Sequence, residues 1–443
     1  MIRVTKSEAP DVSVAVEDAR FPAPFDGGLE YSAPARGTWN IVHTGMLIPG
    51  AHQIFVCAEG CLRGVVLTAA EMGEAFARRF STLAVREGNV IDGDMETFIV
   101  EGVSDILGKL PQKPPAVLVY TSCLHHFLGT DLALVYRLLG ERFPAIAFTD
   151  CYMNPIMRKS GLTPDELMRR QLYSLLDRAD DPDKKAVHIA GNDFATDADS
   201  DLIRLLRAGG FAVKECAATG TFADYKALAD AAFCVTTYPA AKAAGEYLER
   251  VYGQKHLHLP FSFDADEISA QYGALCEALH IPVPDLSAEI TAGEEALATA
   301  REVIGDTPVA IDYTAFSRPL GLARLLVSHG FRVERVYADG FTAAAKDGFA
   351  WLCRHAPRLR LYPTVHPAMR VAERACGEPM LAVGQKAAYF TGTDRFVNIV
   401  ENGGLYGFSA VRTLAELMKD AFLAPKDARA LIQIKGWGCA CAL

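Results

Sequence analysis

Short apolar runs alternate with longer amphipathic segments along most of the chain. Runs rich in Val, Ile, Phe and Tyr predict buried strands, and apolar positions at helical spacing predict helices. The expected strands occupy residues 53–56, 116–122, 145–150, 186–190, 211–215, 232–236, 256–260, 309–313, 332–337, 359–363 and 387–390. The expected helices occupy residues 65–80, 93–107, 131–141, 162–176, 199–208, 224–231, 240–252, 266–279, 320–328, 343–355, 367–375 and 409–421.

This alternation predicts an α/β fold whose parallel sheets are built from right-handed βαβ units. The 443 residues suffice for about three domains of ~150 residues each. Polar, Pro-containing segments near residues 180–183 and 306–308 mark the expected boundaries. We therefore expect three Rossmann-like α/β domains in series after an extended N-terminal arm. The predicted parts are residues 1–38, 39–183, 184–306 and 307–443.

Two local signals refine this division. Residues 1–38 are rich in Pro, Gly, Ser and charge, so they are expected to form either an arm that wraps a partner or an unattached tail. Thr163-Pro164-Asp165-Glu166 predicts a capped helix start, because Thr can accept a hydrogen bond at the N-cap and Pro suits the first helical position.

The charge and the lengths of the apolar runs exclude two classes of partner. The formal net charge is −10 and no long run of Lys and Arg occurs, so neither nucleic acid nor an anionic membrane is expected as a partner. No apolar stretch approaches the ~20 residues that a membrane span needs. Because residues 1–6 lack the apolar core of a signal peptide, we expect a cytoplasmic protein.

Eleven cysteines in a reducing compartment indicate core residues, reactive thiols or metal ligands rather than disulfides. Cys57 and Cys61 lie four residues apart, between the apolar run 53–56 and a predicted helix. Gly60 and Gly64 allow the backbone to approach a bound group closely. Thiolates beside a helix start are stabilised by the positive end of the helix dipole.

Two further cysteines follow predicted strands of the same domain. Cys123 comes after residues 116–122, and Cys151 comes after residues 145–150. Ligands of open α/β sheets bind at the carboxyl ends of parallel strands, and soft thiolates favour iron–sulfur clusters. The candidate ligands are Cys57, Cys61, Cys123 and Cys151.

Other motifs point to no chemistry. Residues 102–110 only superficially resemble a phosphate-binding loop, because the spacing is one residue too long and Leu110 replaces the Ser or Thr that binds magnesium. We expect the end of a surface helix there, and no nucleotide. His125 and His126 are adjacent and so point in different directions, which favours a surface or interface role. The other cysteines lack ligand-like spacing and are expected in the core or on a C-terminal tail: Cys216, Cys234, Cys276, Cys353, Cys376, Cys439 and Cys441.

Three features together resemble component 1 of the nitrogenase-type oxidoreductases. They are Gly-Cys-Leu-Arg at residues 60–63, Thr-Ser-Cys with a following Gly-x-Asp at residues 121–131, and the three α/β units. This family includes nitrogenase, its cofactor-scaffold relatives, dark-operative protochlorophyllide reductase and related reductases of tetrapyrroles and organosulfur compounds. The resemblance covers residues 38–424 and implies that Cys61 and Cys123 bind an iron–sulfur cluster at a subunit interface.

The sequence also departs from the nitrogenase pattern. No cysteine precedes Cys57, although nitrogenase subunits have an earlier cluster ligand, so Cys57, Cys151 or a partner residue would substitute. Thr237 stands where the catalytic alpha subunit has its cofactor cysteine, and the stretch 402–408 has no histidine nearby, since His366 is the last in the chain. The resemblance therefore implies a beta-type subunit, or a family member that carries no nitrogenase-type cofactor, and in either case a chain that supplies no ligand to such an active-site cofactor.

The resemblance implies an oxidoreductase subunit that accepts electrons from a separate ATP-dependent iron–sulfur reductase. It would relay them through a 4Fe-4S or P-cluster-like iron–sulfur cluster to a substrate that the sequence does not name. The expected partner is an alpha-type component 1 subunit or a second copy of the chain. Two alternatives stay open: a non-catalytic scaffold for metallocluster or tetrapyrrole assembly, and an α/β binding protein with structural cysteines.

Overall fold

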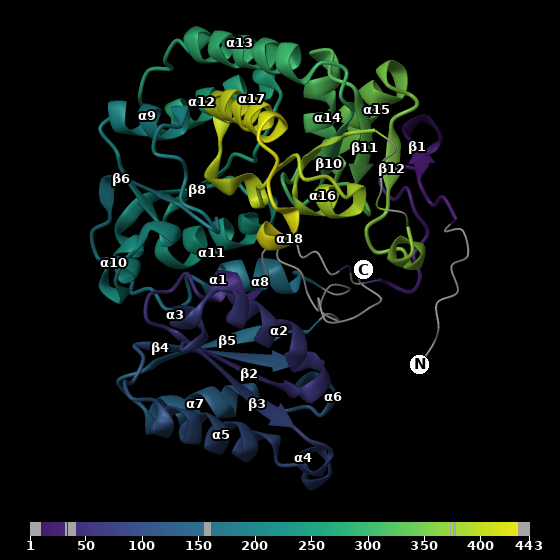
Figure 1. The fold of residues 1–443 in the computed structure, drawn as a ribbon. Coiled ribbons are helices and arrows are strands. Elements are labelled where there is room, and N and C mark those ends of the chain that lie inside the picture. Colours follow the sequence, from purple (N-terminus) through teal and green to yellow (C-terminus); the bar gives the residue numbers. More distant parts are fainter. Residues whose placement is uncertain are drawn as a thin grey trace. The chain divides into compact units, whose positions relative to one another are not determined.

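The structure is a computed structural model that describes residues 10–31, 33, 41–154, 161–372, 374 and 378–432. Contacts divide the chain into two compact units. Residues 39–195 and 206–260 form one unit, and residues 196–205 and 261–443 form the other together with residues 1–38. The first unit contains two four-stranded sheets, and the second contains a six-stranded sheet (Figure 1).

The first sheet has the strand order β3-β2-β4-β5, and all of its strand pairs are parallel. Apolar side chains alternate between its two faces, because successive strand residues point to opposite sides. Ile54 and Val56 pack with helices α5 and α7, whereas Phe55 belongs to a second cluster that includes Met168 of α8. The strands are β2 (His52–Ala58), β3 (Phe80–Val85), β4 (Ala116–Ser122) and β5 (Ala147–Met153). The helices are α1 (Ile41–Gly45), α2 (Glu59–Glu71), α3 (Glu74–Ala77), α4 (Glu87–Asp92), α5 (Met95–Lys109), α6 (Cys123–Phe127), α7 (Leu132–Arg142) and α8 (Pro164–Gln171).

The second sheet has the order β7-β6-β8-β9 and is also parallel throughout. It shares the second cluster with the first sheet, since Cys234 of β8 and Leu248 of α11 pack there. Its elements are β6 (Asp183–Ile189), α9 (Asp201–Ala208), β7 (Ala212–Glu215), α10 (Phe222–Lys226), β8 (Ala231–Thr236), α11 (Lys242–Tyr252) and β9 (Lys255–His258).

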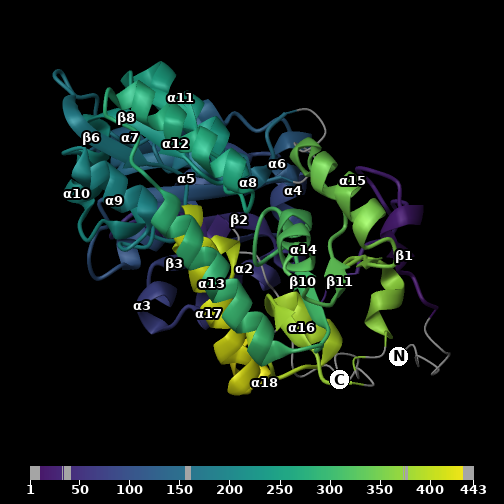
Figure 2. The ribbon, with the colours of Figure 1, turned by 90° about the horizontal axis from the view of Figure 1, so that it is seen from above.

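The third sheet has the order β1-β12-β11-β10-β13-β14. Among its described strands only the pair β1–β12 is antiparallel, and β1 belongs to the N-terminal arm. Helices α13 and α17 lie side by side in this unit (Figure 2). The strands are β1 (Val14–Ala15), β10 (Val309–Asp312), β11 (Val333–Tyr337), β12 (Arg360–Tyr362), β13 (Leu381–Val383) and β14 (Phe396–Val397). The helices are α12 (Ala265–Leu279), α13 (Ser287–Ile304), α14 (Pro319–Ser328), α15 (Lys346–His355), α16 (Gln385–Thr391), α17 (Gly407–Leu423) and α18 (Ala428–Leu431).

The predicted α/β class with parallel sheets is confirmed. The predicted start of α8 is also confirmed, because the Thr163 hydroxyl accepts a hydrogen bond from the Glu166 amide and Pro164 is the first helical residue. The helix ends at Gln171, earlier than the predicted Leu176. The division at residues 38, 183 and 306 stays a prediction. No helix among the described residues is long and apolar enough to cross a membrane.

Several predicted elements are wrong. The expected strand 387–390 lies in α16, a helix that is buried on every side, so its apolar run carries no helical period. The expected helix 65–80 starts earlier, at Glu59, and gives way to strand β3 at Phe80. Of the expected helix 367–375, only the 3₁₀ turn Pro367–Arg370 forms among the described residues. The predictions also omit the helix α13 and the strands β1, β3, β13 and β14.

Candidate metal centre

The first two candidate ligands lie at the corner between β2 and α2. Cys57 is the last residue but one of β2 and is buried, whereas Cys61 is in the first turn of α2 and is exposed. No side chain caps the start of α2 at Ala58, so the first-turn amides present their positive field to the Cys61 thiol. A Cβ atom added at Gly60 or Gly64 would meet no other atom within 4 Å, which leaves open space beside this corner.

The third candidate ligand lies at the neighbouring corner. Cys123 is the first residue of α6, directly after β4, and is partly buried. Strands β2 and β4 are parallel neighbours in which Val56 pairs with Thr121, so their carboxyl ends lie at the same edge. The Ser122 amide donates a hydrogen bond to Nδ1 of His125 at 3.1 Å, and this bond fixes the turn that carries Cys123.

The Cys57 thiol lies near the thiols of Cys61 and Cys123. Burial, and then the nearby Cys61 and Cys123 thiols, raise the pKa of Cys57 to about 12. Cys57 is therefore protonated at neutral pH in the metal-free chain. Bound iron would reverse this preference, because a coordinating thiol loses its proton.

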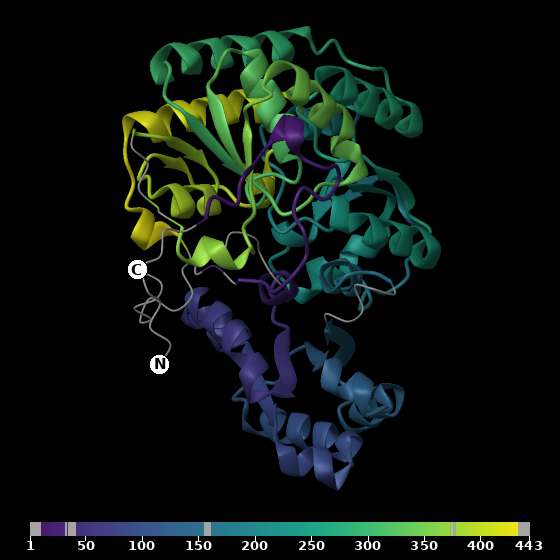
Figure 3. The same cartoon turned by 90° about the vertical axis from the view of Figure 1, so that its right-hand side faces the viewer.

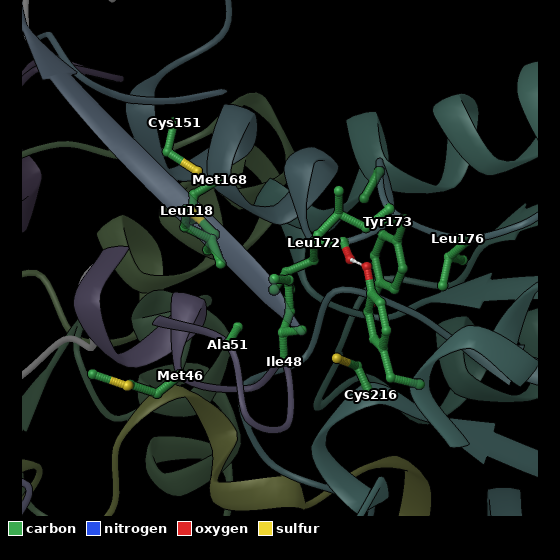
Figure 4. Packing of buried hydrophobic residues seen from close by; sticks show 14 of the residues in the cluster. Met46, Ile48, Ala51, Leu118, Cys151, Met168, Leu172, Tyr173, Leu176 and Cys216 are labelled. Carbon is green, nitrogen blue, oxygen red and sulfur yellow. Dashed lines mark hydrogen bonds between the residues drawn. The ribbon is translucent and has the colours of Figure 1, made fainter. Parts of the chain in front are cut away.

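The fourth candidate ligand lies deeper in the sheet. Strand β5 continues to Met153, so the prediction that Cys151 ends its strand is wrong. Cys151 is fully buried, pairs with Tyr120 across the strands and packs with Met168 (Figure 4). Burial, and then the nearby Asp150 carboxylate, raise the pKa of its thiol well above the usual value. Cys151 thus lies two residues inside the strand, in a hydrophobic environment.

The donor set at the two corners fits an iron–sulfur cluster better than a single ion. Within the described part of the chain, no three His, Cys, Asp or Glu side chains are arranged to hold one metal ion. A cluster makes a different demand, because each cysteine binds a different iron atom and the sulfurs lie farther apart than around one ion. Cys57, Cys61 and Cys123 are soft donors grouped beside open space, which is the type of donor that an iron–sulfur cluster uses.

The structure also shows where the other residues considered in the sequence lie. Residues 102–109 are part of α5, so the interpretation of this segment as a helix end is confirmed. His125 is buried, which contradicts its expected surface role, whereas His126 is exposed. Cys216, Cys234 and Cys276 are buried and Cys353 is partly buried, while Cys376, Cys439 and Cys441 lie outside the described residues.

Thr237, which stands where the catalytic alpha subunit has its cofactor cysteine, forms a local hydrogen bond. The Thr237 hydroxyl donates to the side-chain oxygen of Asn192 at 3.1 Å. Cys234 is fully buried within β8, and Nδ1 of His366 accepts the Ala368 amide at 3.2 Å. The absence of a ligand to a nitrogenase-type cofactor stays a prediction.

One buried polar group, Lys386, was not predicted from the sequence. It lies in the first turn of α16 and is 7% exposed. Its ammonium donates to the Tyr313 hydroxyl at 2.8 Å and to the Thr364 hydroxyl at 3.3 Å. The available signal was Gly384 before Gln385 and Lys386 at the end of an apolar run, but the following residues were interpreted as a strand.

The family model for nitrogenase component 1 type oxidoreductases matches residues 42–375. The chain belongs to this family. The family that the sequence motifs resemble is therefore confirmed. The comparison with curated proteins found no match.

Solved structures of nitrogenase component 1 have the same fold. One, described as nitrogenase Cp1 at pH 6.5, has a TM-score of 0.64 at 16% identity and covers 90% of this chain and 94% of its own. A second, nitrogenase Cp1 at pH 5, has a TM-score of 0.59 at 12% identity and covers 90% of both chains. At these identities the likeness shows the fold alone, so the chemistry of this chain must be argued from its own residues.

Proposed function

We propose that this chain is a subunit of a nitrogenase-like oxidoreductase and holds an iron–sulfur cluster with Cys57, Cys61 and Cys123. The observation that carries the proposal is the grouping of three cysteines at the corners β2–α2 and β4–α6 of two neighbouring parallel strands, where the Cys61 and Cys123 thiols lie near enough to Cys57 to raise its pKa. Membership of the oxidoreductase family gives this cysteine group its context.

Each cysteine has a distinct task at this site. Cys61 presents an exposed thiol from the first turn of α2. Cys57 would lose its proton on binding iron. Cys123 would connect the β4–α6 corner to the β2–α2 corner through the cluster. When bound, the cluster supplies single-electron transfer. Because Cys151 lies two residues inside β5, whereas Cys57 lies at the end of β2 beside Cys61, we assign the remaining ligand to a partner subunit, although Cys151 was the fourth ligand expected from the sequence.

The proposed partners are an alpha-type component 1 subunit, or a second copy of the chain, and an ATP-dependent iron–sulfur reductase. Phe127 and Leu128 support a subunit contact beside Cys123, because these apolar side chains are 68% and 40% exposed. Residues 102–109 form part of a helix and not a phosphate-binding loop. This supports a separate protein as the one that hydrolyses ATP and supplies the electrons.

Iron content tests the cluster directly. Anaerobically purified protein, with its partner subunit if required, should be brown and contain iron and acid-labile sulfide. Cys61→Ala and Cys123→Ala should each lose most of the iron, since each removes a ligand. Cys353→Ala is the matched control, because Cys353 is partly buried and its thiol donates to the Val16 carbonyl in another part of the chain.

Equal iron content in all three variants would refute the cluster assignment. A scaffold for cofactor assembly would also bind iron, so a second measurement separates it from an enzyme subunit. The purified complex of an enzyme reduces a small molecule over many turnovers, whereas a scaffold transfers its cluster or precursor once.

A further inference from the structure

The described part of the N-terminal arm is attached to the third sheet. Strand β1 pairs with the outer edge of β12, with Val14 opposite Leu361 and Ala15 opposite Arg360. The Val16 amide then donates to the Leu359 carbonyl at 2.8 Å. An edge strand of a parallel sheet is thus covered by the chain's own N-terminal residues.

One side chain of the sheet holds the beginning of the arm. The guanidinium of Arg360 donates to the Asp11 carboxylate at 2.9 Å, to the Ser13 hydroxyl at 2.8 Å and to the Ser13 carbonyl at 2.9 Å. All three partners lie within three residues of one another. Arg360 is therefore the main polar attachment of the arm before β1.

Beyond β1 the arm continues to the carboxyl ends of the parallel strands. The Pro22 carbonyl accepts the Phe341 amide at 2.9 Å in the loop after β11. The Tyr31 amide donates to the Val365 carbonyl at 2.6 Å in the loop after β12. Figure 3 shows this purple segment running along the green third sheet. The arm therefore passes over the edge at which open α/β sheets bind ligands.

Lys386 lies between two segments that the arm contacts. Thr364, which accepts a hydrogen bond from the Lys386 ammonium, precedes Val365, the residue bonded to Tyr31. Ala387, which follows Lys386, packs in a hydrophobic cluster with Tyr31. The Lys386 ammonium contacts two hydroxyl groups and the face of the Tyr313 ring, and among the described residues it forms no direct ion pair. The buried Asp312 carboxylate is near enough for the Lys386 charge to act on it. Burying an ammonium without a direct ion pair costs free energy, so hydration of Lys386 favours opening of whatever covers it.

We propose that residues 10–31 form a strap that closes the carboxyl edge of the third sheet over Lys386 and that can be released from its N-terminal end. The attachments favour this direction of release, because the arm before Val16 is held by the two-residue strand β1 and by one arginine. Release gives water and small solutes access to the Lys386 ammonium. The inference concerns the third sheet and is independent of the cluster at Cys57, Cys61 and Cys123.

Amine labelling of the full-length protein tests the strap. The protein is treated with acetic anhydride, and acetylation of each lysine is followed by peptide mass spectrometry. Lys346 is exposed and serves as the internal standard. In the wild-type protein Lys386 should be acetylated far more slowly than Lys346. Arg360→Ala should raise the rate at Lys386 several-fold, because the arm loses its main polar attachment.

Arg358→Ala is the matched control, since Arg358 is an exposed arginine two residues before Arg360. It should leave the rate at Lys386 unchanged. Hydrogen exchange of the Val16 amide reports independently whether Arg360→Ala has loosened the arm. Faster exchange at Val16 with continued protection of Lys386 would overturn the proposal.

A second variant decides the outcome if Arg360→Ala leaves the arm in place. Removal of residues 1–26 takes away β1 and the Pro22 contact, and circular dichroism checks that the fold persists. Rapid acetylation of Lys386 in this folded variant supports the strap. Continued protection of Lys386 would show that other residues bury it and would overturn the proposal.

Discussion

At the residue scale, Cys57 and Cys151 form a matched pair for the ligand set. Both are buried in the same hydrophobic cluster of the first sheet. Cys57 lies at the strand end beside Cys61, whereas Cys151 is two residues inside β5. We predict that Cys57→Ala removes most of the iron and Cys151→Ala retains it, at a similar stability cost of about 1–2 kcal/mol. Iron analysis and urea unfolding of both variants check this, and iron loss in Cys151→Ala would restore it to the ligand set.

A second prediction at this scale concerns His188 in β6. Burial, and to a smaller extent the positive charge of Lys214, lower the pKa of His188 from 6.5 to about 4. The hydrogen bond with Gln254 partly offsets this shift. The folded state therefore binds its proton less readily than the unfolded state does. The associated stability is present above pH 6.5 and is lost as the pH falls from 6.5 towards 4.

The expected loss from this one group between pH 7 and pH 5 is roughly 2 kcal/mol. His188→Phe removes the titrating group, so its urea midpoint should fall less on acidification than that of the wild type. The comparison uses the pH dependence of each protein, because the substitution also changes packing beside Tyr173. Equal pH dependence in both proteins would contradict the assigned shift.

At the element scale, the start of α16 requires glycine at position 384 for its backbone conformation and for lack of space. Its φ is 109°, and an added Cβ would contact the carboxylate of Asp312. That carboxylate accepts the Ala387 amide at 2.7 Å and so holds the first turn of the helix. We predict that Gly384→Ala destabilises the third-sheet unit by roughly 2–4 kcal/mol.

The control is Gly305→Ala in the same unit. Gly305 also has a positive φ, 59°, but a Cβ there would meet nothing within 4 Å. This variant should cost roughly 1–3 kcal/mol, because φ 59° with ψ −144° is a conformation that only glycine adopts readily. Gly384→Ala should cost more than this, because it adds the contact with Asp312. Urea unfolding monitored by circular dichroism gives both values. Similar losses in the two variants would mean that the Asp312 contact is relieved without cost.

The elements that the sequence predicts correctly are those with local signals. Thr163 and Pro164 define the start of α8 through capping chemistry that involves neighbouring residues only. By contrast, α16 depends on Asp312, a residue about seventy positions earlier in the chain. Its complete burial also removes the polar face that identifies a helix. Local pattern cannot reveal contacts of that kind.

The same distinction explains the candidate site. Cys61 and Cys123 could be identified because each stands in a short motif at a strand–helix corner. The burial of Cys151 inside β5 could not be predicted, because it depends on how far the strand continues and on which residues pack against it. The proximity of Cys123 to Cys57 required the strand order, which places β2 beside β4.

At the scale of the whole molecule, the proposed electron supply must come from another protein. Residues 102–109 lie within helix α5, where backbone amides are used in helical hydrogen bonds and cannot cradle phosphates. The Lys109 ammonium pairs with the Asp105 carboxylate at 2.6 Å on the helix surface. We therefore predict that the purified chain neither binds nor hydrolyses ATP, as measured by calorimetry and phosphate release.

The corresponding prediction for the complex is that reduction of the cluster depends on ATP only through the reductase. With the reductase and ATP present, electron paramagnetic resonance should show a change in the cluster signal. The change should disappear when the reductase carries a substitution of its own nucleotide-binding lysine. It should persist when Lys109 of this chain is changed to Ala, since Lys109 has an exposed surface ion pair. ATP hydrolysis by the isolated chain, or loss of the signal in Lys109→Ala, would contradict an external source of ATP-driven electrons.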